Sequence, residues 1–368
     1  MSAPINPPFH ADHVGSLLRP AELLEARARR AAGKISVDEL RSIEDRCIRD
    51  VVKLQEDAGL QAITDGEFRR TWWHFDFLSG FDGFELGRPL DSGTFKSSEI
   101  EQPPSARITG RLKRSKPIMV EHFSYLNGLT DRTAKFTVPG PSMAHFRAGR
   151  AGISKEVYPD LEPFWADLTA AYRAELGDLA ANGCRYIQLD DISYAYLCDS
   201  DVRAKLASEG EDADALALTY AQALNDSIRD LPEDVVTGIH MCRGNFQSTW
   251  AASGGYEPVA EAVFNTVKVD ALFMEYDSER AGGFEPLRFV PKDKVAVLGL
   301  VTTKTPGLES KDALKRRIDE AAKFIDLDRI CLSPQCGFSS THHGNKITEA
   351  DEIAKLRLVV EVAEEIWG

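Results

Sequence analysis

The sequence has no long hydrophobic run and no sign of an export signal. No stretch of 18 or more apolar residues occurs in its 368 residues, so no membrane-spanning helix is predicted. The first residues, MSAPINPPFHADHVGS, lack the basic segment and following apolar stretch that secretory signals have. We therefore expect a cytoplasmic protein without a membrane partner.

Positive charge is also scarce. Lys and Arg total 44 against 58 Asp and Glu, which gives a formal net charge of −14. Because a nucleic-acid surface needs a basic patch to neutralise phosphates, this balance argues against a nucleic-acid partner and favours a small-molecule ligand. The chain lacks tandem repeats, low-complexity tracts and long linkers, so we expect residues 1–368 to form a single domain.

Cysteine occurs at only six positions, which does not suggest a disulfide framework in a chain of this length without a signal peptide. A cysteine with a functional role is therefore better explained as a metal ligand or a nucleophile than as half of a disulfide. The four that lie in helical or strand patterns are interpreted as small packed hydrophobic residues: Cys47, Cys184, Cys198 and Cys331.

What the sequence does have is eight short apolar or β-branched runs, each ending in a polar or glycine-containing cluster. They cover residues 10–16, 60–68, 134–142, 184–191, 235–242, 269–277, 295–304 and 329–338. Amphipathic helical patterns lie between most of them, at 37–60, 158–183, 214–231, 256–266 and 310–325, and a last one covers 348–367. This alternation predicts an α/β fold in which a parallel sheet closes into a (β/α)8 TIM barrel.

Two segments fall outside this alternation. Residues 72–133 lack a clean helical period, and PIMVEHFSYL at 117–126 is interpreted as a strand. We therefore expect a β-rich insertion after the second barrel strand. Residues 17–36 predict an extra N-terminal helix over the barrel mouth.

Groups that can ionise, coordinate or donate end nearly every predicted strand, at the barrel face where TIM-barrel active sites lie. They are His13, Ser16, Asp65, Glu67, Asp190, Asp191, His240, Cys242, Glu275, Asp277, Lys304 and Cys336. A purely structural barrel has no need of such a set, although any single member could be a capping or solvated side chain.

His240 and Cys242 lie two residues apart at the end of the fifth predicted strand, so both side chains point to one face. Both side chains can then bind the same metal ion. Cys336 and Glu275 at other strand ends could complete a tetrahedral Zn²⁺ shell. The alternative is a buried cysteine beside a hydrogen-bonded histidine. A bound Zn²⁺ would ionise a substrate thiol at neutral pH, which suits alkylation of sulfur.

An ordered set of motifs carries a resemblance to a known family: HVGS (13–16), DGEF (65–68), IQLDD (187–191), HMC (240–242), MEYD (274–277) and SPQCG (333–337). Together they resemble the catalytic half of cobalamin-independent methionine synthase, and above all its short, single-barrel members. The resemblance spans nearly the whole chain, from His10 to Trp367.

This resemblance implies a zinc-dependent methyltransferase that converts homocysteine to methionine. The implied zinc ligands are His240, Cys242, Glu275 and Cys336. The implied homocysteine-binding residues are Ser16, Glu67 and Asp190. Two carboxylates suit an ammonium group, and a hydroxyl with backbone amides suits a carboxylate.

The chain departs from the long enzymes of the family in two ways. It has no second, N-terminal barrel-like half to help hold the folate, so the methyl donor stays open between 5-methyltetrahydrofolate, a methylated corrinoid and a small methylated compound. Where those enzymes place a histidine after the seventh strand, this sequence has Lys304, which we expect to be the catalytic residue on the donor side.

Several further residues have both a functional and a structural interpretation. His13 adjoins the Gly15–Ser16 loop and is a candidate substrate contact. Trp72 could stack on a flat heterocycle, but aromatic residues entering an insertion usually form its core. The His342–His343 pair is interpreted as a solvated loop, and Asp191 as a supporting or capping side chain.

Two other functions remain open. Zinc-activated thiol alkylation also occurs in the related epoxyalkane:coenzyme M transferases, but a sulfonate thiol would leave Glu67 and Asp190 without an ammonium to hold. A closed Cys/His shell would instead indicate a non-catalytic metal-binding or thiol-binding barrel. The expected partners are a small thiol and a methyl donor, and the sequence is compatible with a homo-oligomer.

Overall fold

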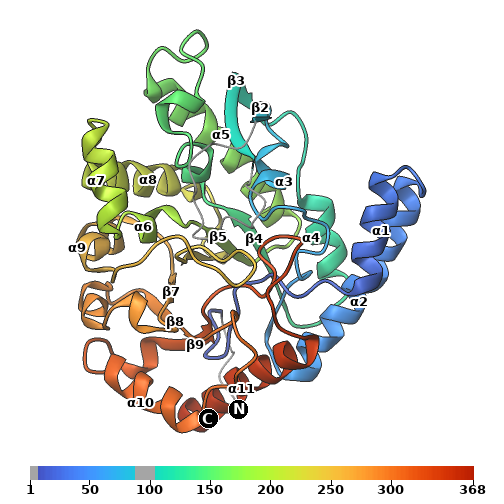
Figure 1. Ribbon diagram of the computed structural model, residues 1–368, viewed down its shortest axis with the longest axis vertical. Helices are drawn as coiled ribbons and strands as arrows, with labels where there is room; N and C mark the ends of the chain where they lie inside the picture. Colours follow the sequence, from blue (N-terminus) through green and yellow to red (C-terminus); the bar gives the residue numbers. More distant parts are fainter. Residues whose placement is uncertain (1–6, 88–103) are drawn as a thin grey trace.

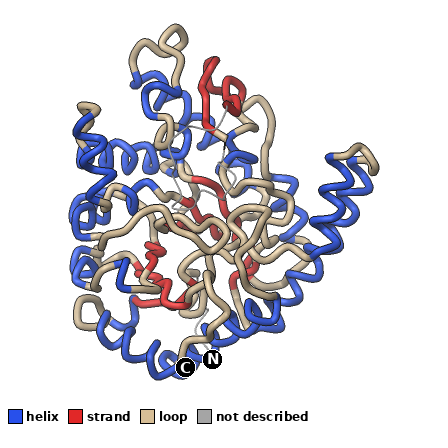
Figure 2. The backbone as a smooth tube through the Cα atoms, in the orientation of Figure 1, coloured by secondary structure: helices blue, strands red, loops and turns tan. Residues whose placement is uncertain are grey.

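The computed structural model describes residues 7–87 and 104–368. Its centre is a seven-stranded sheet in which every neighbouring pair is parallel, in the order β1-β4-β5-β6-β7-β8-β9. The strands are β1 (Ala62–Ile63), β4 (Thr133–Pro139), β5 (Tyr186–Asp190), β6 (Val236–Met241), β7 (Ala271–Glu275), β8 (Val295–Val301) and β9 (Ile330–Pro334). Together with a surrounding layer of helices, this curled sheet forms a TIM-barrel-type α/β fold (Figures 1 and 2), as the sequence predicts.

The first predicted strand is reduced to a single β-bridge between Ala11 and Leu332 of β9. The backbone N–H of Asp12 donates to the Leu332 carbonyl at 3.0 Å. On the other side, a ring nitrogen of His13 lies 3.0 Å from the Ala62 carbonyl, and the Thr64 hydroxyl donates to the Gly15 carbonyl at 2.6 Å. Side chains thus replace part of a backbone ladder between this segment and β1.

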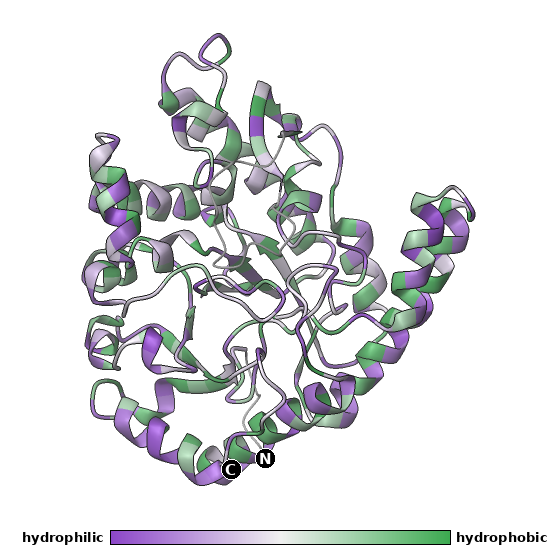
Figure 3. Cartoon of the chain, viewed as in Figure 1, coloured by the Kyte–Doolittle hydropathy of each residue, from purple (hydrophilic) through white to green (hydrophobic). Residues whose placement is uncertain are grey.

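The main covering helices are α2 (Val37–Ala58), α5 (Leu161–Ala181), α8 (Ala213–Ile228), α9 (Glu257–Thr266), α10 (Lys311–Ala321) and α11 (Glu349–Trp367). Short helices lie in the loops: α3 (Phe75–Leu78), α6 (Ser193–Tyr196), α7 (Ser200–Ser208), η1 (Pro141–Ala144), η2 (Gly149–Gly152), η3 (Glu279–Ala281), η4 (Glu285–Phe289) and η5 (Leu327–Arg329). Hydrophobic and hydrophilic bands alternate along the outer helices (Figure 3), as expected for helices with one buried face. Among the described residues, no helix combines the length and apolar composition that crossing a membrane requires.

The extra N-terminal helix is α1 (Ala21–Ala31). It packs along α2 at the side of the barrel (Figure 1), whereas the sequence predicts it over the mouth. Its buried face is narrow, with Leu23 and Ala26 inward, so the neighbouring helix is enough to cover it.

The insertion contains an antiparallel hairpin of β2 (Asp82–Gly87) and β3 (Ser105–Lys113), which confirms its β-rich character. The strand predicted at 117–126 is wrong, because this segment forms the helix α4 (Val120–Asn127). The buried residues Phe123 and Leu126 of α4 and Met119 just before it recur at helical spacing, and the apolar run is too short to show that period clearly.

Candidate active site with a metal-binding cluster

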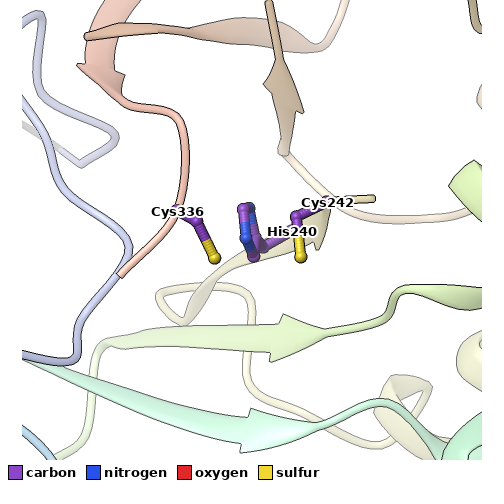
Figure 4. Close-up of side chains that lie close together, drawn as sticks. All are labelled: His240, Cys242 and Cys336. Atoms are coloured by element: carbon purple, nitrogen blue, oxygen red, sulfur yellow. The ribbon is translucent and has the colours of Figure 1, made fainter. Parts of the chain in front are cut away.

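Three potential metal ligands meet where β6 and β9 end. His240 belongs to β6, Cys242 follows it directly, and Cys336 lies in the turn after β9. One ligand atom from each lies within 4.8 Å of the other two. Figure 4 shows the His240 ring between the two cysteine side chains. All three residues are buried.

The chemistry of this cluster fits a thiophilic metal ion. Both ring nitrogens of His240 are buried and lack a hydrogen-bond partner within the described part of the chain. A buried imidazole without partners is costly, and a metal ion would satisfy it. Imidazole nitrogen with two thiolates is a donor set that Zn²⁺ accepts in tetrahedral sites with one further ligand. The neighbouring Cys242 thiol, then His240 and Lys304, lower the pKa of Cys336 well below its usual value against the effect of burial.

Glu275, the fourth predicted metal ligand, ends β7 and is completely buried. Its Oε2 accepts the backbone N–H of Arg243 at 2.7 Å. Its Oε1 accepts from Lys304 Nζ at 3.3 Å and from the Arg280 guanidinium. Burial would raise the pKa of Glu275, but Lys304, Arg280 and Arg243 together lower it to about 2. The structure therefore places an ionised carboxylate beside the cluster, already bound to cations.

Lys304 lies in the loop after β8, between two acids. Its Nζ is 3.3 Å from Glu275 Oε1 and 3.3 Å from Asp277 Oδ2. Although burial disfavours the ammonium, these two ion pairs raise the pKa of Lys304 above its usual value. Lys304 is not among the described residues that line the neighbouring cavity.

A cavity that is partly open to solvent adjoins the cluster. It brings together most of the residues that the sequence singled out: Ser16, Glu67, Trp72, Asp190, His240, Cys242 and Cys336. A thiol reaching the metal cluster would therefore have a hydroxyl and two carboxylates within the same cavity.

The loop that carries Ser16 fits tightly against its neighbours. Gly15 has φ +135°, and a Cβ there would lie 2.7 Å from Thr137 and 3.3 Å from Glu67 Oε1. Lys135 donates to the His13 carbonyl at 2.6 Å and to Asp12 at 2.9 Å, which anchors the start of the loop inside the barrel. Glycine is required here because a side chain would displace Glu67 or Thr137.

The two carboxylates of the cavity are held in different ways. Glu67 has φ +59°, a left-handed conformation uncommon for a residue with a side chain, and its Oε1 accepts from the Thr137 hydroxyl at 2.9 Å. Asp190 accepts from the Gln188 amide at 2.7 Å. Burial is the main cause that raises both pKa values, that of Asp190 to about 7, with Glu67 adding to the shift at Asp190. A cation bound between the two carboxylates would stabilise their ionised forms and so offset the free-energy cost of burying two negative charges.

His13 is not among the described residues that line the cavity. Its ring faces the Ala62 carbonyl, and burial first, then Lys135, lowers its pKa to about 4. Trp72 does line the cavity, and its ring stacks on Phe246 with centroids 6.0 Å apart. His342 and His343 lie partly exposed in the loop after β9, as predicted, and their rings pack edge-on against Trp72.

Several cavity residues were not assigned a role from the sequence: His74, Arg147, Asn245 and Phe246. Asn245 donates to the Gly337 carbonyl at 2.8 Å and so fixes the loop that carries Cys336. Asn245 ends the sequence CRGN (242–245), which begins with the candidate ligand Cys242, and this position was the available signal for it. Arg147 follows no recognisable motif, and only the fold brings its loop to the cavity. Asp191 accepts from the hydroxyls of Ser142 and Ser193, consistent with a supporting role.

Comparison with known proteins identifies the family. The sequence model for the catalytic domain of cobalamin-independent synthases matches residues 9–365. The chain belongs to this family. Bacillus subtilis YxjG, an uncharacterized protein, is 44% identical to it over 364 residues, which cover 98% of this chain and 95% of YxjG.

Other members of the cobalamin-independent synthase family extend the comparison. The crystal structure of a candidate vitamin-B12-independent methionine synthase from Listeria monocytogenes matches with a TM-score of 0.79 and 37% sequence identity, over 99% of both chains. A methionine synthase from Pyrococcus horikoshii is 23% identical over 328 residues, which cover 88% of this chain and 84% of that enzyme.

Proposed function

We propose that the protein is a zinc-dependent methyltransferase that transfers a methyl group to the thiol of homocysteine and forms methionine. The observation that carries this proposal is the meeting of His240, Cys242 and Cys336 at one cavity with Ser16, Glu67 and Asp190. The name of the Pyrococcus horikoshii relative agrees with it. The cytoplasm, where homocysteine and reduced thiols occur together, is the expected location.

Each group of the cavity has a chemical task in this reaction. Zn²⁺ held by His240, Cys242 and Cys336, with Glu275 as the predicted fourth ligand, would lower the pKa of a bound thiol so that sulfur reacts as thiolate. Glu67 and Asp190 bind the homocysteine ammonium. Ser16 and the adjacent backbone amides bind its carboxylate, so that the sulfur is directed at the cluster.

The methyl donor approaches from the open side of the cavity, where Trp72 and Phe246 form an aromatic wall. Such a wall suits a flat heterocyclic donor, and 5-methyltetrahydrofolate is the donor we propose to test first. Lys304, predicted from the sequence to serve the donor side, is held by ion pairs with Glu275 and Asp277.

The test is methionine formation from homocysteine by zinc-loaded protein, with 5-methyltetrahydrofolate, methylcobalamin and S-methylmethionine offered in parallel. We expect turnover with one donor, and loss of that turnover in Cys336→Ser. Absence of methionine with all three donors, from protein shown to hold one zinc per chain, would refute the homocysteine assignment. Turnover of an epoxide with a sulfonate thiol would then support the alternative alkyl transfer.

A further inference from the structure

One buried cation, Arg19, bridges the loops that follow β1 and β9. The residue is 7% exposed and lies just before α1. Its Nη1 donates to the Ser339 hydroxyl at 2.7 Å and to the carbonyls of Ser339 and Thr341 at 3.1 and 3.2 Å. Its Nη2 donates to the carbonyls of Glu67 and Arg70, both at 2.8 Å. A single side chain thus binds two loops that are far apart in the sequence.

Each end of this guanidinium holds a loop that carries a site residue. Nη1 is bound to the loop after β9, in which Cys336 lies. Nη2 is bound to the first and the last residue of the turn Glu67–Arg70, which the Arg70 N–H closes by donating to the Glu67 carbonyl at 3.0 Å. Because the N–H groups of a guanidinium have fixed directions in one plane, Arg19 holds this turn at a set position relative to the loop of Cys336.

The acceptors of Arg19 carry no charge. They are four carbonyls and one hydroxyl, and among the described residues no carboxylate forms an ion pair with Arg19. Burial lowers the pKa of Arg19 to about 10, so the side chain is still a cation at neutral pH. A buried cation is costly unless its hydrogen bonds are made, so any movement of either loop away from Arg19 is opposed.

Glu67 needs such support because its backbone is strained. Its φ of +59° lies in the left-handed region, which is costly for a residue with a side chain and persists where surrounding contacts enforce it. The Glu67 carbonyl accepts from Arg19, and the Glu67 N–H donates to Asp65 Oδ1 at 2.8 Å. These two bonds fix the peptide groups on both sides of Glu67 and thereby the direction in which its side chain leaves the backbone.

One carboxylate oxygen of Glu67 is left for a ligand. Oε1 accepts from the Thr137 hydroxyl at 2.9 Å, whereas Oε2 is buried and has no hydrogen-bond partner within the described part of the chain. Arg70 Nη1 lies 3.8 Å from Oε2, which is too far for a hydrogen bond. An ammonium group of a ligand in the cavity would supply the missing donor, so the placement of Oε2 bears on which thiols bind.

We propose that Arg19 is a positioning residue that holds Glu67 for the ammonium group of the substrate, and so makes the protein selective for amino-acid thiols over thiols that lack an ammonium group. This inference deepens the proposed function and rests on it. Arg19 is not among the described residues that line the cavity. It acts through the backbone of Glu67, and the loop after β9 serves as its anchor.

The test is calorimetric binding of two thiols to the zinc-loaded protein: homocysteine, and 4-mercaptobutyrate, its analogue without the amino group. Arg19→Lys keeps the charge but loses the planar fork that spans both loops. We expect homocysteine binding to weaken by about 10-fold or more, the scale of one charged hydrogen bond, and 4-mercaptobutyrate binding to change by less than about 3-fold.

A double-mutant cycle with Glu67→Gln tests whether the effect passes through Glu67. In the Glu67→Gln background, Arg19→Lys should weaken homocysteine binding by less than about 3-fold, because the carboxylate that Arg19 positions is gone. Two results would overturn the proposal. Equal weakening for both thiols would show a general structural role, and an undiminished effect of Arg19→Lys in the Glu67→Gln background would show that Arg19 acts elsewhere.

A matched control comes from the opposite end of β9. Arg329 directly precedes this strand and also donates to backbone carbonyls, those of Val290, Pro291 and Lys294. Arg329→Lys makes the same chemical change at the end of the barrel away from the cavity. It should leave the binding of both thiols unchanged.

Ser339→Ala is a milder variant that keeps Arg19. It removes the hydroxyl that binds Nη1 and leaves the carbonyl acceptors, so it should fold even if Arg19→Lys does not. The preference for homocysteine over 4-mercaptobutyrate should fall by about 3-fold or more. An unchanged preference in folded Ser339→Ala, as judged by circular dichroism and a thermal melt, would overturn the proposal.

These binding measurements use no methyl donor, which separates this inference from the proposed function. A protein that binds homocysteine with the expected pattern among the variants but forms no methionine would refute methyl transfer and support the role of Arg19. A protein that prefers homocysteine and keeps that preference in Arg19→Lys would refute this inference alone. A protein that binds neither thiol would refute both.

Discussion

Gly337→Ala is a sharp test of the role given to Ser16. Gly337 follows Cys336 directly, and a Cβ at this position would lie 1.9 Å from Ser16 Oγ and 3.0 Å from its Cβ. Ordinary contacts between heavy atoms are about 3.5 Å, so the hydroxyl would have to move by roughly 1.5 Å. The obstacle is the end of a small side chain rather than backbone, so the variant should fold.

The expected result is a loss in kcat/KM for homocysteine of about 100-fold, because a displacement of about 1 Å in a positioning group can cost that much. Zinc content, measured by mass spectrometry of the purified protein, should stay near one per chain. Ser16→Gly in the Gly337→Ala background removes the clash but not the functional loss, so activity should stay low. A Gly337→Ala protein with kcat/KM within about 3-fold of the parent would refute the assignment of Ser16 to the homocysteine carboxylate.

Three further predictions address the metal, the ammonium site and the fold. Cys336→Ser removes one of the three converging ligands and should lower zinc affinity by more than the roughly 100-fold limit seen for supporting residues; retention of zinc by this variant in chelator competition would contradict the site. Glu67→Gln should raise the homocysteine KM by about 10-fold or more through loss of a charged contact, with little effect on a thiol that lacks the ammonium group, and equal KM changes for both thiols would count against it. Glu352 on α11 is buried, and burial raises its pKa from 4.5 to about 8. The folded protein therefore binds more protons than the unfolded chain between pH 4.5 and 8, and the free energy of unfolding should fall across this window by at most about 5 kcal/mol from this group. Glu352→Gln should remove that decline, so the variant's advantage in urea denaturation should grow from pH 5 to pH 8; parallel pH profiles would show that Glu352 is hydrated.

Much of the barrel could be predicted from the sequence because its strands are buried on both faces. Runs such as Val295–Val301 are almost wholly apolar and are separated by long amphipathic helices. The sequence therefore shows both that these runs are strands and in which order they follow one another. The Ala11 segment could not be predicted in detail, because hydrogen bonds from His13 and Thr64 side chains replace its ladder with β1. The segment around α4 was misassigned because eight residues are too few to separate helical from strand periodicity.

The sequence could predict which residues of the candidate site lie near the cavity. Cys336 lies far from Cys242 in the chain, yet both follow barrel strands, and the barrel brings such positions together. The ion pairs of Lys304 with Glu275 and Asp277 could not be predicted, because side chains at the same strand ends can face the cavity or one another. Charge type alone does not decide between these orientations.

The loop that carries Ser16 is hydrogen-bonded to both of its neighbours. The Ser16 carbonyl accepts the N–H of Phe338, next to the loop of Cys336, and the N–H of Leu17 donates to Gly66, beside Glu67. The proposed ammonium site, the proposed carboxylate site and the metal-binding cluster should therefore keep fixed spacings. The cavity should therefore select thiols by their length. When the charged end of a thiol of the right length is bound, its sulfur is held at a high local concentration near the metal site. A homologue one methylene shorter or longer, such as cysteine, would bind by one end only, and discrimination among cellular amino-acid thiols would follow from the rigidity of three loops.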